Sequence, residues 1–307
     1  QIPRCTTDEH IKSRIHKVDK NKIFKEFNNS DVLLIPGFQG INSKNEITTL
    51  GRGGSDTSAV AVAASLDAEC IIYTDVEGVF TTDPNLVKNA KKISQISYEE
   101  MLELASQGAK VLQTRSVELA MRKKTKLSVR SSIKPNSSGT VVTEENSKLE
   151  NNTVSGIAYS KDEAKITLSR VLDKPGVSSK IFSPLAKGNI NVDMILQNVS
   201  QDGKYANLSF TLPRNDLEKA LKILKKEKSK IGYKRINSSN NISKISVIGV
   251  GMRSHAGVAQ TLFETLGKNK INIQVITTSE IKISILIDEK FTDLAVQKLH
   301  KAYKLHI

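Results

Sequence analysis

The sequence predicts a mixed α/β protein, in which a layered domain with a parallel sheet is followed by two copies of a βαββα unit. In the first half, a glycine-rich loop and a helix of small residues lie between two apolar runs at 31–37 and 69–75. This order is typical of a βαβ unit. The second half contains an internal repeat, because Gly176 matches Gly257 and the surrounding stretches align without a gap at an offset of 81 residues.

The remaining elements of the first half also have local signals. The two apolar runs read as buried strands, and the small residues between them predict a helix over about 55–66. The spacing of "SYEE" at 97–100 is that of a capping box, so a helix should begin there and end near Gly108. A further helix around 115–123 and two short strands, "KLSVRSS" and "GTVVT", are expected to close the domain near residue 143.

Each copy of the repeat begins with an alternating strand, "AKITLSRV" or "ISKISVIGV", and passes through a glycine turn into an amphipathic helix. Two more strands and a final helix follow, which is consistent with a ferredoxin-like sheet that has its helices on one face. One such unit buries little core alone, so the copies should pair. The predicted boundaries are 1–143 for the first domain, 144–160 for a linker, and 161–238 and 239–307 for the two repeats.

Composition excludes several classes of protein. Of the 307 residues, 38% are hydrophobic and 25% are charged, and no apolar run approaches the roughly 20 residues that span a membrane. The net charge of +14 comes mainly from the second half, which contains 25 basic and 13 acidic residues. Aromatic residues are only 5%, so we expect no nucleic-acid partner and read the charge as a solvated surface. Cys5 and Cys70 are far apart, which favours a reducing, cytoplasmic location.

The glycine loop "TLGRGGSDTSAV" at 49–60 has the features of an anion site. Its glycines let the backbone turn sharply or lie against a ligand, and the following helix presents free N–H groups. Arg52 offers a planar fork for a carboxylate or phosphate, and Ser55 can cap the helix or bind the same anion. A tight turn with an exposed arginine and a capping serine explains the same residues equally well. The spacing matches neither a P-loop nor a dinucleotide fingerprint.

Asp56 suggests that a cation accompanies the anion, because a carboxylate beside an anion site is otherwise repulsive; a phosphate-bound Mg²⁺ would remove the conflict. An acidic residue in the first turn of a helix is also favourable by itself. The segment "YTDVEGVFTTDPN" at 73–85 follows the second strand of the βαβ unit. Ligands of open α/β sheets bind beyond the carboxyl ends of strands, although a polar turn is the simpler interpretation of this segment alone.

Together, "TLGRGGSDTSA", "YTDVEGVFTTDP", "GAKVLQTRSVELA", "GTVV" and two tandem ACT-type repeats resemble aspartate kinase. The motifs occur in the order of that family and cover essentially the whole chain, and they are most similar to its lysine- and threonine-sensitive branch. The resemblance implies an amino-acid-kinase-type α/β domain followed by two ferredoxin-like ACT domains. It also implies transfer of the γ-phosphoryl group of MgATP to the side chain of L-aspartate, which opens lysine, diaminopimelate, threonine and methionine biosynthesis.

Site residues follow from the resemblance position by position. Arg52 and Asp56 would be catalytic, with Arg52 and Ser55 holding the carboxylate of L-aspartate and Asp56 serving as the Mg²⁺ ligand. The residues implied to bind ATP are Thr74, Asp75, Phe80, Thr82, Asp83 and Lys110. The chemistry agrees, because a carboxylate is already a competent nucleophile that the protein has only to position.

The repeats would bind lysine and threonine as effectors. The glycine turn before each first helix offers backbone donors to an amino-acid carboxylate, whereas by themselves these segments read as ordinary turns and strands. The residues implied for the effector site are Asp173, Gly176, Ser178, Asn191, Val192, Asp193 and Gln197, facing Asn272, Ile273, Thr278 and Glu280 of the second repeat or of a partner subunit. A homodimer or hetero-oligomer through the ACT domains is expected.

Two departures from the family pattern bear on activity. Asn85 stands where the family usually has an arginine that could touch the phosphates. The Lys-Phe-Gly-Gly segment of the family does not occur in the sequence, so a polypeptide that starts at Gln1 is expected to lack kinase activity. A catalytically dead fragment or a regulatory subunit that only binds effectors and dimerises is therefore the alternative. Another amino-acid kinase, such as a glutamate or uridylate kinase, is disfavoured by the tandem repeats.

Overall fold

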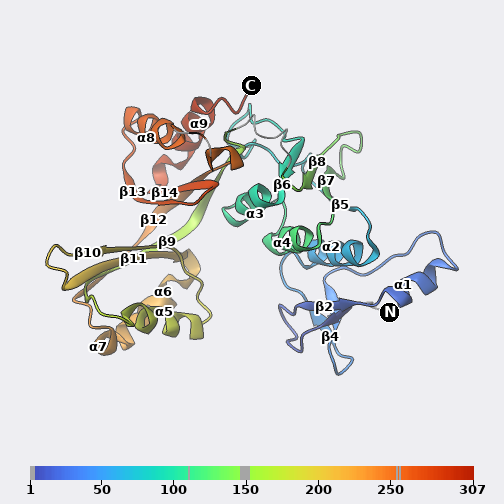
Figure 1. Cartoon of the computed structure of the whole chain (residues 1–307), viewed down its shortest axis with the longest axis horizontal. Coiled ribbons are helices and arrows are strands. Elements are labelled where there is room, and N and C mark those ends of the chain that lie inside the picture. Colours follow the sequence, from blue (N-terminus) through green and yellow to red (C-terminus); the bar gives the residue numbers. More distant parts are fainter. Residues whose placement is uncertain (1–3, 110, 146–152, 254, 256) are drawn as a thin grey trace.

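A computed structural model describes residues 4–109, 111–145, 153–253, 255 and 257–307 of the chain (Figure 1). Among these residues, the strands of the first half form two four-stranded sheets and those of the second half form one six-stranded sheet. The two halves lie side by side, and helix α3 of the first half faces the large sheet of the second (Figure 1). The predicted mixed α/β class is confirmed.

The first sheet carries the approach to the glycine loop. Its strand order is β2-β1-β3-β4, and a short helix, α1, follows β2. The elements are Arg4–Thr6 (β1), Ile15–Val18 (β2), Lys20–Phe27 (α1), Gln39–Ile41 (β3) and Ile47–Thr49 (β4). Because β4 ends at Thr49, the glycine loop begins where this sheet stops.

The second sheet, of order β5-β7-β8-β6, carries three helices, and most of its elements match the sequence prediction. The elements are Gly54–Leu66 (α2), Cys70–Thr74 (β5), Gln95–Ser97 (β6), Tyr98–Ser106 (α3), Thr114–Lys123 (α4), Leu127–Ser131 (β7) and Thr140–Thr143 (β8). Strands β5 and β7 pair in parallel, as do β6 and β8, but β7 and β8 are antiparallel, so the sheet is mixed and not parallel as predicted. Ser97 and Glu100 form the predicted capping box of α3, and Met101 packs into a core with Val129.

The expected strand at 31–37 is not formed. Residues 32–36 have no regular secondary structure, and Val32 and Leu34 are 83% and 99% exposed. Helix α2 and strand β5 are present, so the second and third members of the predicted βαβ unit are confirmed and the first is wrong. An apolar run becomes a strand only where another strand pairs with it, and no strand of the described chain pairs with this one.

The six-stranded sheet has the order β10-β11-β9-β12-β14-β13. The elements of the first repeat region are Gly156–Leu172 (β9), Val177–Lys187 (α5), Asp193–Val199 (β10), Tyr205–Pro213 (β11), Arg214–Asp216 (η2), Leu217–Lys226 (α6) and Lys228–Ile231 (α7). Those that follow are Arg235–Ile248 (β12), Val250–Arg253 (η3), Val258–Lys268 (α8), Ile273–Thr278 (β13), Lys282–Asp288 (β14), Glu289–Phe291 (η4) and Thr292–Ala302 (α9).

The two repeats share strands, and two of the predicted boundaries fall inside them. Residues at the start of β9, expected to be linker, pair with the end of β12, Gly156 opposite Ile248. The end of β9 instead pairs with the start of β12, Ser169 opposite Arg235. Both strands therefore pass through both repeats, so the boundaries at 160/161 and 238/239 cut through continuous strands. The polar residues in the middle of β9 interrupt its apolar pattern, so the sequence does not indicate a strand of 17 residues.

The helices of the two repeats cover opposite faces of this sheet, with α8 and α9 on one side and α5 and α6 on the other (Figure 1). The side chains of β9 show the same division. Ile157 packs with Leu262 of α8, whereas Ile166 packs with Ile181 of α5. Each repeat thus has its helices on one face of its own strands, as predicted. In the described part of the chain, no helix is long and apolar enough to cross a membrane.

Candidate active site and regulatory interface

The glycine loop joins β4 to α2 through two residues in the left-handed region, Gly51 with φ 80° and Gly53 with φ 70°. Glycine is required at Gly53 for a second reason, since a Cβ there would lie 1.9 Å from the side chain of Gln113. The loop therefore packs directly against the start of α4 and delivers the chain into the first turn of α2. This geometry leaves the first N–H groups of α2 without partners in the helix, as an anion site requires.

Arg52, Ser55 and Asp56 gather at this helix start. Arg52 and Ser55 are exposed, and the Arg52 guanidinium has no hydrogen-bond or ion-pair partner among the described residues. Asp56 is half-buried, and burial raises the pKa of its carboxyl, with backbone hydrogen bonds from Gln113 and Asp56 itself opposing the shift. Burial, followed by the charge of Asp56, raises the pKa of Cys70, at the start of β5, to about 11.

A second arginine, Arg115, fixes the loop and was not predicted. Its guanidinium donates to the carbonyl oxygen of Leu50 over 2.7 Å and to that of Ser13 over 3.1 Å. One side chain from the first turn of α4 therefore joins the glycine loop to the first sheet. The sequence carries one weak signal for this role, because a cation in the first turn of a helix opposes the helix dipole and needs a compensating contact.

The predicted ATP residues line one cavity of about 750 Å³ beyond the carboxyl end of β5. The structure brings together Thr74, Asp75, Phe80, Thr82 and Asp83 there, with Asn85 also in the wall. Thr82 is 5% exposed, and its hydroxyl has no hydrogen-bond partner in the described chain, so it is available to a bound polar group. Lys110 lies outside the described residues, while its neighbours Ala109 and Val111 line the cavity.

The regulatory half supplies the other wall of this cavity, which sequence reasoning missed. Tyr159, Ser160 and Arg214 all line it. The Tyr159 hydroxyl donates to Asp83 Oδ2 over 3.0 Å. No local pattern announces a contact between residues 76 positions apart, so only the fold reveals it.

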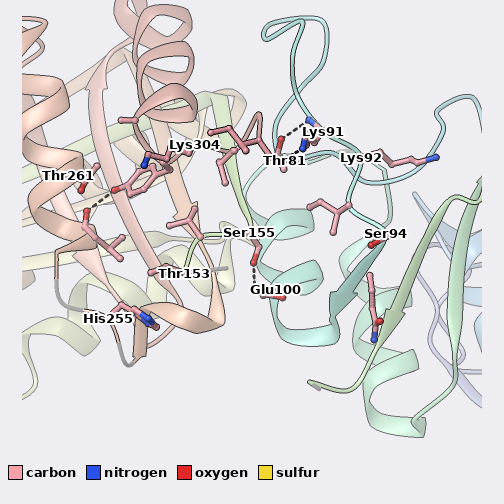
Figure 2. A pocket seen from close by; sticks show the side chains of 18 of the residues that line it. Thr81, Lys91, Lys92, Ser94, Glu100, Thr153, Ser155, His255, Thr261 and Lys304 are labelled. Carbon is pink, nitrogen blue, oxygen red and sulfur yellow. Dashed lines mark hydrogen bonds between the residues drawn. The ribbon is translucent and has the colours of Figure 1, made fainter. Parts of the chain in front are cut away.

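Helix α3 forms a second junction between the halves through three polar side chains at helical spacing. Glu100, 3% exposed, accepts hydrogen bonds from the Ser155 hydroxyl and from the backbone N–H of Val250. Glu103 pairs with Lys282 over 2.8 Å, and Gln107 accepts from Ser246 over 3.1 Å. Figure 2 shows Glu100 and Ser155 meeting at the edge of an interdomain cavity of about 770 Å³. The capping residue predicted from sequence thus also anchors the regulatory half.

The predicted effector residues fall into groups on separate elements. Gly176 is in the left-handed region with φ 86° and caps α5, and Ser178 follows in the first turn. Asp173 accepts a hydrogen bond from the Gln197 side chain over 3.2 Å, which joins the glycine turn to β10. Asn191 and Val192 lead into β10. Asn272, Ile273 and Thr278 lie at or beside β13, followed by Glu280; β10 and β13 are opposite edges of the sheet.

Asp193, at the start of β10, is already paired. Its carboxylate lies 2.7 Å from the Lys244 ammonium, which also contacts Glu163 over 3.0 Å. Lys244 and Glu163 are 5% and 7% exposed, whereas Asp193 is largely exposed. Burial raises the pKa of Asp193, but Lys244 lowers it further, and the net shift is downward. Asp193 is thus a charged group that faces both the sheet interior and solvent.

Comparison with known proteins defines the class. Residues 2–131 match the amino acid kinase family, and residues 169–227 and 245–303 each match the ACT domain. The chain is therefore a kinase domain joined to a pair of ACT domains, as the fold indicates.

Relatives along the whole chain then identify the family. The aspartokinase of Pseudomonas aeruginosa is 48% identical over 308 residues, which cover 99% of this chain and 74% of the relative. The structure of E. coli aspartokinase III in complex with aspartate and ADP superposes with a TM-score of 0.81 at 27% identity, covering 98% of this chain and 68% of that one. The same enzyme in complex with lysine and aspartate gives 0.75 at 28%, covering 97% and 67%. The chain belongs to the aspartate kinase family.

Proposed function

We propose that this protein transfers the γ-phosphoryl group of MgATP to the side-chain carboxylate of L-aspartate and so forms 4-phospho-L-aspartate, the first step of lysine, diaminopimelate, threonine and methionine biosynthesis. The observation that carries the proposal is the cavity beyond β5, in which all five predicted ATP residues of the described chain meet. The relative of known structure binds aspartate and ADP. The two cysteines are both free, which suits a cytoplasmic enzyme.

The proposed roles divide substrate binding from charge neutralisation. Arg52, free of partners in the described chain, binds a carboxylate of aspartate together with Ser55. Thr74, Asp75, Phe80, Thr82 and Asp83 enclose the nucleotide, and Lys110 neutralises its phosphates. Because the aspartate side chain is ionised at neutral pH, it needs no general base, and the protein accelerates the reaction by orienting it.

A magnesium ion fits the residues at the helix start. Mg²⁺ keeps several water ligands and takes one or two carboxylates together with phosphate oxygens, so Asp56 alone meets the protein's share. Burial raises the pKa of Asp56, and a bound cation would favour its charged form. When bound, the ion would neutralise charge on the transferring phosphoryl group.

The test measures whether the protein, expressed from its own gene, forms ADP in a reaction that depends on L-aspartate. Hydroxylamine traps the acyl phosphate product. Arg52→Gln should lower kcat/KM for aspartate about 10- to 100-fold, since a charge-assisted hydrogen bond contributes about 1.5–3 kcal/mol. Arg122→Gln, an exposed arginine paired with Glu118, is the matched control and should change little. Equal kcat/KM in both variants would overturn the role of Arg52.

We further propose that lysine and threonine regulate the enzyme through the ACT repeats and that subunits associate there. The relative in complex with lysine and the glycine turns at Gly176 and Gly257 support this. Because β10 and β13 are opposite edges of the sheet, a partner subunit offers the direct way to bring the two groups of effector residues together. Calorimetric titration with each amino acid tests the sensor, and absence of heat with both would refute it. Saturable binding without turnover would instead indicate a regulatory subunit.

A further inference from the structure

The segment that follows β5 is held by the regulatory half at Thr81. The backbone N–H of Ile157, on β9, donates to the carbonyl oxygen of Thr81 over 2.8 Å. The Thr81 hydroxyl lies 2.9 Å from Nε2 of His300, on α9, and both residues are buried. The position of this segment therefore depends on where β9 and α9 lie.

Tyr159 extends this attachment into the proposed ATP cavity. It follows Ile157 by two residues on β9, so both side chains point to the same face. Its hydroxyl donates to Oδ2 of Asp83, while Oδ1 of Asp83 accepts from the backbone N–H of Asn85 over 2.8 Å. Both carboxylate oxygens are thus engaged, and the side chain is held in one orientation at the cavity wall. Burial, followed by the charge of Asp83, raises the pKa of Tyr159 to about 12, so the hydroxyl keeps its proton at neutral pH.

The same strand reaches the effector residues at its other end. β9 is a single strand, Gly156–Leu172, with a register shift against β11 between Leu168 and Val171, and it spans about 55 Å at 3.3 Å per residue. The next residue is Asp173, which the Gln197 side chain joins to β10. Midway along β9, Glu163 shares Lys244 with Asp193. One continuous element therefore contacts both the effector turn and the segment that lines the ATP cavity.

We propose that Tyr159 is a positioning residue for the nucleotide, acting through Asp83, and that β9 couples the effector turn to the ATP cavity through this hydroxyl. The inference rests on the proposed function, because it assumes that the nucleotide occupies the cavity that Asp83 lines. It adds a named contact by which a displacement of the regulatory sheet changes nucleotide affinity. Since coupling between two sites is reciprocal, nucleotide must change effector affinity by the same factor.

The test is titration calorimetry of the full chain with MgADP, with and without saturating L-lysine. Tyr159→Phe removes only the hydroxyl and should weaken MgADP binding about 3- to 10-fold, which corresponds to one net hydrogen bond. It should also abolish most of the change that lysine causes in the MgADP Kd. Tyr303→Phe is the matched control, because its hydroxyl donates to Val258 over 2.7 Å within the second repeat. The control should lose comparable thermal stability yet bind MgADP as the wild type does.

The outcomes separate the two proposals. If the wild type fails to bind MgADP, the proposed nucleotide site is wrong and the role of Tyr159 falls with it. If the wild type binds and Tyr159→Phe binds equally well, the nucleotide site stands and the positioning role is refuted. A wild-type MgADP Kd that lysine leaves unchanged would refute the coupling along β9. Equal weakening in Tyr303→Phe would show a general loss of structure instead of a specific contact.

Discussion

Two arginines at the glycine loop differ in what their guanidinium groups contact. Arg52 is exposed and has no partner in the described chain, so it can receive a ligand. Arg115 uses its guanidinium to hold the carbonyl oxygens of Leu50 and Ser13. The sequence predicts a binding role for Arg52 because this residue lies inside a local motif. It could not identify Arg115, whose partners are 65 and 102 residues away.

Arg115→Met should therefore destabilise the protein although it lies outside the proposed substrate site. The change removes two charge-assisted hydrogen bonds and leaves carbonyl groups to find new partners, so we expect the free energy of unfolding to fall by about 2–4 kcal/mol. Urea unfolding measures the change. Arg122→Met on the same helix is the control, because its exposed pair with Glu118 should contribute at most about 0.5 kcal/mol. Equal stability of the two variants would contradict the role given to Arg115.

At the scale of elements, the sequence predicted those whose signals are local. The capping box located α3, and the glycine loop located the start of α2. The strand predicted at 31–37 is wrong because the apolar character of the run says nothing about whether a neighbouring strand exists to pair with it. The start of β9 lies in the predicted linker because its pairing with β12 joins distant segments, which no local pattern indicates. For the same reason, local motifs predict only one wall of the cavity proposed for ATP, since Tyr159 and Arg214 reach it from the other half of the chain.

The antiparallel pairing of β9 with β12 gives a prediction about a buried ion pair between these two strands. Lys244→Met would leave Glu163 buried beside Asp193 without its cation, and breaking a buried ion pair from one side costs about 3–5 kcal/mol. Adding Glu163→Gln removes the uncompensated buried charge, so the double variant should regain most of the lost stability. Urea unfolding of the single variants and the double variant completes the thermodynamic cycle. If the double variant is as unstable as Lys244→Met, the ion pair is not what the site depends on.

At the scale of the whole molecule, polar contacts join the two halves, and one of them involves a buried histidine. His300 of α9 is 1% exposed and meets Thr81 of the first half, with the ring of His306 at 6.4 Å. Burial first, and the charge of His306 second, lower the pKa of His300 from its ordinary value of 6.5. The folded protein therefore takes up this proton at a lower pH than the unfolded chain does. Because proton uptake by the unfolded state favours unfolding, the interface should weaken in mild acid.

The expected result is a wild-type free energy of unfolding that decreases as the pH falls below about 6.5, until the lowered pKa of folded His300 is passed. His300→Gln keeps a polar partner for Thr81 but cannot be protonated, so its stability should depend less steeply on pH in this window. Thermal unfolding between about pH 5.5 and 7.5 measures both slopes.

His16→Gln, at an exposed position, is the control and should follow the wild type. Buried carboxyls with raised pKa values, such as Glu163, titrate alike in all three proteins, so only the difference between curves reports on His300. Parallel curves for the wild type and His300→Gln would show that this contact does not set the pH response of the interface.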